Sequence, residues 1–273
     1  MIKKYRFLIA RRITQISIMV LYVIANLFGI NILMGNLSSS LVLNTIPLSD
    51  PYAVLQMFFA GAVISFDILL GAFFILIFYM ILGGRAFCSW VCPVNIITDF
   101  ANYLRKKFGF NQIQKKQPAS RNIRYWIIAI SFIISFLMGI TAFELISPIS
   151  MVHRGIIFGM GFGWAVISII FLFDLFVLKN GWCGHICPLG GFYSLIGRFS
   201  FLRVHHNAQN CTACMKCKDI CPENQVLHMI TKTSMPVLSG ECTNCGRCVE
   251  VCDDNALNFS IKNLKKEKQN EVR

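Results

Sequence analysis

The sequence predicts an α-helical membrane domain followed by a small cysteine-rich domain that mixes helices and strands. Three observations support this prediction. Hydrophobic residues make up 55% of the 273-residue chain and charged residues only 14%, against roughly 25% charged residues in a typical soluble domain. Four long apolar runs lie in the first two thirds of the chain. All twelve cysteines fall in spaced groups, and eight of them lie in the last quarter.

Each apolar run is long enough to cross a membrane. The runs cover residues 13–34, 58–82, 126–146 and 156–178. The first would form a helix of about 33 Å at ~1.5 Å per residue, which matches a hydrocarbon core of roughly 30 Å. A cleaved signal peptide is the alternative for this run, but it is too long and no small-residue cleavage site follows it. We therefore expect a four-helix transmembrane domain over 1–200, a cysteine-rich domain over 205–262 and a charged tail over 263–273.

The positive charges are distributed unevenly between the segments that connect the runs. Basic residues gather before the first run and between the second and third runs: Lys3, Lys4, Arg6, Arg11, Arg12, Arg85, Arg105, Lys106, Lys107, Lys115, Lys116, Arg121 and Arg124. The segment 35–57 has none, and the segment between the third and fourth runs has only Arg154. The positive-inside rule then predicts that both termini and all twelve cysteines face the cytoplasm, where thiols stay reduced. We attribute the net charge of +13 to membrane orientation and anionic headgroups, not to nucleic acid.

The membrane part is an internal repeat. Each half runs out and back and ends with a glycine-containing turn and a C-x3-C-P motif, Cys88 and Cys92 in the first half, Cys183 and Cys187 in the second. Two such hairpins predict a parallel repeat about an axis along the membrane normal, which would bring the four cysteines together. Residues i and i+4 share one face of a helix, so each pair can present two thiols. A further cluster, a redox-active dithiol and a copper or zinc site all fit these cysteines.

The last eight cysteines form two runs with C-x2-C-x2-C-x3-C spacing. The first run is Cys211, Cys214, Cys217 and Cys221, and the second is Cys242, Cys245, Cys248 and Cys252. Thiolates at this spacing hold [4Fe–4S] clusters, which move one electron at a time, and the fourth cysteine of each run binds the other cluster. The first three cysteines with Cys252 are therefore expected to hold one cluster, and Cys221 with the second three to hold the other. Zinc is the alternative, but zinc ligands usually come as C-x2-C pairs separated by longer loops.

Few residues are available to organise this domain without a cofactor. The segment 205–261 has about 57 residues, and a segment of this size buries little core, so cluster ligation is expected to organise it. Cys252 is followed by Asp253, where Cys221 is followed by Pro222. Net charge is one determinant of cluster potential, so this carboxylate could lower the potential of the nearby cluster.

The combination of four apolar runs, two C-x3-C-P motifs and a C-terminal two-cluster ferredoxin-like domain resembles the NapH family. These are ferredoxin-type membrane subunits of the periplasmic nitrate reductase system and are related to MauN-type proteins. The likeness runs from Arg11 to about Ile261. It implies a component of a quinol dehydrogenase, not a stand-alone enzyme, in a bacterial inner membrane. It further implies menaquinol or ubiquinol as electron source, a periplasmic NapG-like iron–sulfur partner, and a cytochrome or nitrate reductase downstream.

Two ionisable residues are candidates for handling quinol or protons. Asp67 lies nearest the middle of a predicted span, where a charge usually faces the bundle interior or water. His153 lies beside Arg154 on the outer side. Two other functions also fit the sequence: a factor for copper reduction or maturation, and a membrane anchor for a partner iron–sulfur subunit. Cytoplasmic clusters and a periplasmic acceptor leave the route of the electrons across the membrane open.

Overall fold

The computed structural model describes residues 5–29, 33–43, 45–109, 120–159, 161 and 163–261. The described chain divides into two compact units. The first unit contains the described residues up to 10, those of 79–86 and those from 193 on, and the second contains the described residues of 11–78 and 87–192. Both the charged tail 263–273 and the basic residues Lys3, Lys4, Lys115 and Lys116 lie outside the described residues.

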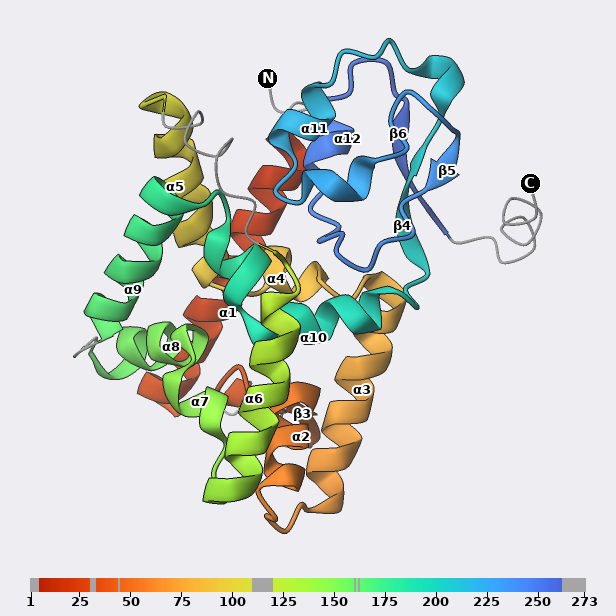
Figure 1. Cartoon of the computed structure of the whole chain (residues 1–273). Coiled ribbons are helices and arrows are strands. Elements are labelled where there is room, and N and C mark those ends of the chain that lie inside the picture. Colours follow the sequence, from red (N-terminus) through yellow and green to blue (C-terminus); the bar gives the residue numbers. More distant parts are fainter. Residues whose placement is uncertain are drawn as a thin grey trace. The chain divides into compact units, whose positions relative to one another are not determined.

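Helical segments follow one another through most of the chain up to Gly197 (Figure 1). They are α1 (Arg6–Phe28), α2 (Pro51–Phe59), α3 (Phe66–Leu82), α4 (Ala86–Trp90), α5 (Val94–Lys107), α6 (Ile123–Met138), α7 (Ala142–Ile146), α8 (Pro148–Phe158), α9 (Gly163–Leu172), the π-helices η3 (Phe173–Val177) and η4 (Trp182–Ile186), and α10 (Pro188–Gly197). Within the second unit, α5 lies alongside α9 and η3, and α2 packs on α6.

The apolar helices are shorter than the apolar runs predict. Among the described residues only α1, with 23 residues or about 35 Å, is long and apolar enough to cross a membrane. The other apolar helices cover Phe66–Leu82, Ile123–Met138 and Gly163–Val177. The expected bounds 58–82, 126–146 and 156–178 are therefore wrong. The bounds 13–34 are wrong too, because α1 ends at Phe28 and Leu33 begins a strand. Four spanning helices are not confirmed. Glycines at positive φ explain two of the breaks, because Gly61 (φ 73°) precedes α3 and Gly139 (φ 65°) ends α6.

Two short helices, α2 and α8, occupy connections for which the sequence predicts no structure. Each has a proline as its first residue, Pro51 in α2 and Pro148 in α8, a position where the missing N–H costs nothing. Both halves of the chain show a similar order of elements: an apolar helix, one short helix in the first half or two in the second, a second apolar helix, a short cysteine-bearing helix and a further helix. In the first half a small antiparallel sheet precedes α2, with strands β1 (Leu33–Gly35), β2 (Ser39–Val42) and β3 (Ile46–Ser49).

The C-terminal part of the first unit is a small α+β fold. Its central strand β4 (Leu202–His206) pairs antiparallel with β5 (Met235–Pro236) and β6 (Leu257–Ile261). Four short helical segments complete it: η5 (Ala208–Asn210), α11 (Lys216–Ile220), η6 (Asn224–Leu227) and α12 (Arg247–Glu250). Its core holds few aliphatic residues and includes three of the cysteines: Val204, Val226, Leu227, Met229, Ile230, Val237, Leu257, Cys217, Cys221 and Cys248.

The stretch 79–86 belongs to this first unit because its backbone packs directly on the backbone of 193–201. A Cβ at Gly84 would lie 2.0 Å from the carbonyl oxygen of Tyr193 and 2.4 Å from the amide nitrogen of Gly197. The Phe201 N–H donates to the carbonyl of Met80 at 3.1 Å. The absence of a side chain at Gly84 therefore allows this approach.

Replacing Gly84 by alanine is expected to destabilise the first unit. The added methyl group meets backbone atoms that cannot rotate away, and such overpacking costs about 1–3 kcal/mol. Thermal unfolding in detergent, followed by loss of cluster absorbance, measures the effect. Gly163→Ala is the control, because the nearest atom to its added Cβ lies 3.7 Å away. Equal melting temperatures for the two variants would contradict the packing assigned to Gly84.

Candidate metal centres

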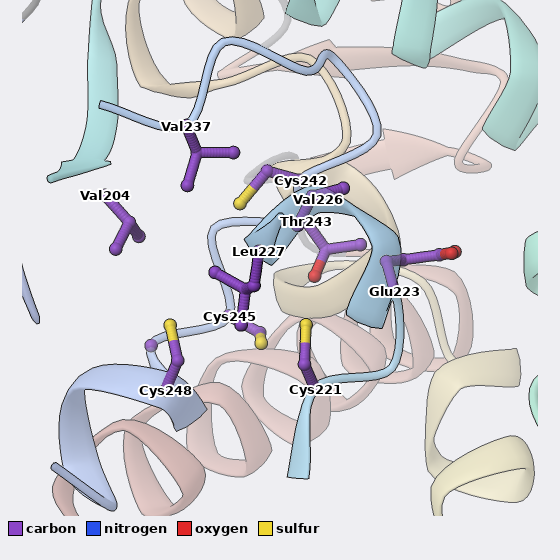
Figure 2. A pocket seen from close by; sticks show the side chains of 11 residues that line it. Val204, Cys221, Glu223, Val226, Leu227, Val237, Cys242, Thr243, Cys245 and Cys248 are labelled. Atoms are coloured by element: carbon purple, nitrogen blue, oxygen red, sulfur yellow. The ribbon is translucent and has the colours of Figure 1, made fainter. Parts of the chain in front are cut away.

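Cys221 from the first cysteine run shares a pocket with three cysteines of the second run. Cys221, Cys242, Cys245 and Cys248 line this pocket together with aliphatic residues from β4 and η6 (Figure 2). Crossed ligation predicts this grouping for the second cluster. The residues are thus placed together, while their binding of a cluster stays a prediction.

The other four cysteines of the two runs also form one group. Cys217 interacts electrostatically with Cys211, Cys214 and Cys252. Cys217 is buried and Cys214 is exposed, so this group reaches the surface of the unit. Nearby, Asp253 pairs with Lys216 at 2.9 Å, and both side chains are largely exposed. The sequence suggests that the Asp253 carboxylate lowers the potential of the nearby cluster. In the structure this carboxylate has a cation beside it.

The two cysteine runs adopt the same loop conformation. Left-handed φ angles occur at Ala213 (61°) and Met215 (59°) in the first run, and at the matching residues Asn244 (48°) and Gly246 (74°) in the second. Alternation of left-handed residues in a loop turns successive backbone N–H groups toward one centre, which favours an anionic group there. Each loop leads directly into a short helix, α11 or α12. The loops thus present three cysteines in the same way.

Burial raises the pKa of two thiols in the second group. The pKa of Cys242 rises to about 11, with Arg203 and Arg85 opposing the rise, and burial raises the pKa of Cys248 well above its usual value. Thiolates are the ligand form. Cluster binding at this group therefore releases protons.

Arg85 forms a buried ion-pair network beside the second group. Its guanidinium donates to Glu223 at 2.7 Å and to Glu241 at 3.1 Å, and the Arg85 and Glu223 side chains are only 1% and 3% exposed. Glu223 lies two residues after Cys221, and Glu241 directly precedes Cys242. Arg85 therefore fixes both chain segments that supply this group.

Several basic residues are buried inside the protein and do not contact anionic headgroups as the sequence predicts. Arg11, Arg85, Arg105 and Arg124 are at most 1% exposed. Arg105, for example, donates to the carbonyls of Asp174 and Leu175 in η3, at 3.2 and 3.1 Å. A charge count along the sequence cannot separate such residues from surface cations.

The four C-x3-C-P cysteines line one pocket in the second unit. Cys88, Cys92, Cys183 and Cys187 share it with Phe87, Val94, Ile149, Trp182, Leu189 and Gly190. We call this group the four-cysteine site. Cys92 and Cys187 are buried, and the other two are half-buried. The structure therefore brings together the two motifs, which lie about 95 residues apart in the chain.

The prolines of both motifs start helices, which explains their place in the pattern. Cys92 is followed by Pro93, the N-cap of α5, and Cys187 is followed by Pro188, the first residue of α10. Backbone N–H groups at a helix N-terminus favour negative charge, and a cysteine there is more readily a thiolate. Burial and the neighbouring cysteines act in the opposite direction and raise the pKa of Cys92.

Three polar residues position the motifs, and of these the sequence singles out only Asp174, as an acid near the inner end of the fourth apolar run. The Gln15 side chain on α1 donates to the carbonyls of Ser89 and Cys92, both at 3.1 Å. The Trp182 N–H donates to the Asp174 carboxylate at 3.0 Å, and Asp174 is fully buried. The Cys183 thiol lies 4.0 Å from the Thr98 hydroxyl on α5. Only the burial of polar side chains on apolar helices could have signalled these roles.

The donor sets fit iron–sulfur clusters. Each of the three groups offers four sulfur atoms, which is the ligand set of a [4Fe–4S] cluster. Within the described part of the chain, no three His, Cys, Asp or Glu side chains converge as ligands of one ion would. When bound, each cluster would supply a one-electron carrier.

The two remaining predicted residues lie in different settings. Asp67 is exposed in the first turn of α3, so its predicted place near mid-span is wrong. The helix begins at Phe66 and not at 58, and a carboxylate in the first turn stabilises a helix. His153 is buried in α8.

Four-sulfur groups, two of them in a small α+β unit with repeated cluster-binding loops, define a ferredoxin-type iron–sulfur electron-transfer protein. A family model described as a 4Fe-4S dicluster domain matches residues 203–253, and one described as a 4Fe-4S binding domain matches 57–111 and 160–205. The chain belongs to the NapH/MauN family of ferredoxin-type proteins, which confirms the resemblance seen in the sequence.

Several curated relatives are similar over most of their length. The methylamine utilization ferredoxin-type protein MauN of Methylorubrum extorquens is 42% identical, with 88% of this chain and 84% of the relative covered. The MauN protein of Paracoccus denitrificans is 41% identical, with 87% and 81% covered. The ferredoxin-type protein NapH of Escherichia coli is 41% identical, with 82% and 78% covered. The comparison with solved structures found no match. The long apolar α1 and this family membership point to membrane association.

Proposed function

We propose that the chain is the membrane-embedded electron-transfer subunit of a quinol dehydrogenase. It would pass electrons from menaquinol or ubiquinol toward a periplasmic nitrate reductase, through a NapG-like iron–sulfur partner and a downstream cytochrome. One observation carries the proposal: the cysteines form three groups of four, one in the apolar second unit and two in the ferredoxin-type unit. Three [4Fe–4S] clusters would accept the two electrons of a quinol one at a time.

The surface of the apolar helices supports a multi-pass placement in the inner membrane. Large apolar side chains are exposed along α3 and α6, among them Phe66, Phe73, Phe74, Trp126, Phe136 and Leu137. Soluble proteins rarely expose contiguous apolar surface of this kind. Helices of 16–17 residues are about 25 Å long, and a bilayer accommodates this by local thinning. The distribution of basic residues supports both termini in the cytoplasm.

The walls of the four-cysteine site support a route for electrons across the membrane. Ile149 lines this site. The rings of Tyr52 and Phe192 lie with their centroids 5.4 Å apart, and Phe192 is in α10, about one turn after Cys187. Ile149 and Tyr52 belong to connections predicted on the outer side, whereas the cysteines belong to turns predicted on the inner side. An electron carrier at this site would be accessible from both sides of the membrane.

Quinol-driven cluster reduction tests the proposal. The full chain, reconstituted in nanodiscs with its partner subunit, is mixed with menaquinol or ubiquinol, and reduced clusters are followed by EPR. We expect their signal to appear within seconds. Unchanged spectra with the partner present would reject the dehydrogenase function. Full electron transfer by Cys214→Ala would indicate a membrane anchor, and copper-dependent oxidation of the reduced clusters would indicate a maturation factor.

The MauN relatives favour a second destination for the electrons. Their names assign them to methylamine utilization, and their identity to this chain equals that of the NapH relatives. Deletion of the gene followed by growth on nitrate and on methylamine separates the two. We expect loss of nitrate respiration, and loss of growth on methylamine alone would assign the MauN role.

A further inference from the structure

His153 is a buried imidazole without a hydrogen-bond partner. Its side chain on α8 is 2% exposed, and neither ring nitrogen has a partner among the described residues. One ring nitrogen of a neutral imidazole donates and the other accepts. An unsatisfied buried polar group costs about 1–3 kcal/mol, so such a group in a native fold calls for an explanation. A ligand with a hydroxyl group would satisfy it.

An aromatic ring and apolar side chains surround this imidazole. The Tyr22 ring on α1 meets His153 edge to face, with ring centroids 4.7 Å apart. Val152 and Met19, on the same two helices, are buried. The Tyr22 hydroxyl is engaged elsewhere and donates to the carbonyl of Asn36 at 3.2 Å. The setting is thus an apolar, aromatic one in which His153 is the group able to exchange protons.

The same two helices connect this pair to the four-cysteine site. Ile149 lines the site, and His153 follows it on the same face of α8, one turn or about 6 Å along the axis. On α1, Gln15 bonds the carbonyl of Cys92, and Tyr22 lies on the same face about 10 Å further along. The pair is therefore close to a four-sulfur electron acceptor without lying among its ligands.

We propose that His153 and Tyr22 form the site at which a quinol is bound and deprotonated. The inference rests on the proposed function and names the residues that would perform its first step. A hydroxyl group of the quinol would supply the hydrogen-bond partner that the His153 imidazole lacks. The quinol ring would pack against the Tyr22 ring. Burial and Arg154 lower the pKa of His153, so the imidazole is neutral near pH 7 and able to accept a proton.

The step balances with the acceptors that the chain provides. The quinol loses two protons and two electrons and becomes the quinone. His153 accepts one proton, releases it to water, and then accepts the second. Each electron reduces one oxidised [4Fe–4S] cluster, so two clusters are reduced per quinol. No further oxidant is required.

His153→Gln tests this site in the full chain with its partner subunit in nanodiscs. Glutamine keeps hydrogen-bonding capacity but not basicity, so the rate of quinol-driven cluster reduction should fall by about 10²-fold or more. Iron content and the EPR spectrum after dithionite reduction should not change. The second measurement is the binding of a fluorescent hydroxyquinoline N-oxide, a quinone analogue, which Tyr22→Leu should weaken about tenfold or more. His228→Gln is the control, because His228 is exposed in the ferredoxin-type unit.

The outcomes separate this inference from the proposed function. Wild-type reduction by quinol with an unchanged rate in His153→Gln overturns the His153 site and leaves the dehydrogenase standing. Failure of the wild type to be reduced overturns both. If His153→Gln loses iron, Tyr22→Leu carries the test from the other helix: unaltered analogue binding and an unaltered rate then overturn the site.

Discussion

Cys88→Ser is expected to remove four of about twelve irons per chain while leaving the ferredoxin-type unit loaded. Cys88 is one of four thiols around a single pocket in the second unit, and serine is a poor cluster ligand of nearly the same size. Cys88 is only half-buried, so the substitution leaves the surrounding packing intact. Iron and acid-labile sulfide per chain, with EPR of the reduced protein, measure the result.

A complementary variant and the unmodified chain make this test decisive. Cys214→Ser should lose the signal of the cluster held by Cys211, Cys214, Cys217 and Cys252, and keep the signal of the four-cysteine site. About eight irons in the wild type, unchanged in Cys88→Ser, would show that the four-cysteine site holds no cluster. About four would leave one cluster in the chain, and zinc in place of iron would reject the iron–sulfur assignment altogether.

Arg85→Met is expected to destabilise the first unit by about 3–5 kcal/mol, because it leaves the buried Glu223 carboxylate and the half-buried Glu241 carboxylate without their cation. Glu223 and Glu241 flank the pocket of the second cysteine group, so its cluster should be lost first on heating. Arg85→Lys should recover part of the stability, because it restores a positive charge near the two carboxylates, which a single guanidinium nitrogen, Nη1, contacts in Arg85. Thermal unfolding followed by the absorbance of the clusters measures the loss.

The same unit contains a matched ion pair at its surface. Lys216 and Asp253 are 57% and 73% exposed, so Lys216→Met should leave the melting temperature nearly unchanged. A similar melting temperature for Arg85→Met and Lys216→Met would mean that the buried network contributes no more than the exposed pair. That outcome would contradict the role assigned to Arg85.

The sequence predicts the cysteine groups well because cluster ligation is set by short local spacings. The C-x3-C-P pairs required one further inference, the internal repeat, and the pocket that Cys88 and Cys183 share agrees with it. Charged residues were predicted less well. Arg85 looks like a topology signal in the sequence, yet its partners lie about 140 and 155 residues further on, and no local pattern announces such a contact.

The predicted bounds of the apolar helices and the predicted position of Asp67 are wrong for a physical reason. Apolar composition continues across Gly61 and Gly139, but the backbone does not, because both glycines adopt positive φ. The shift of the start of α3 to Phe66 moves Asp67 from mid-helix to the first turn. The sequence offers His153 as a candidate for handling quinol or protons only by its position beside Arg154. Its burial and its lack of hydrogen-bond partners depend on how α1 and α8 pack against each other.

The first unit is built from three separated stretches of the chain, and this determines the order in which the two units can fold during synthesis. Phe7 packs against Phe259, with ring centroids 5.4 Å apart, and Gly84 packs against Tyr193 and Gly197. This unit cannot close until Phe259 has left the ribosome, whereas the residues of the four-cysteine site are complete with Gly190. Domains generally fold from the N-terminus during synthesis at about 5–20 residues per second. The residues of the four-cysteine site are therefore available to a metal seconds before the ferredoxin-type unit can fold.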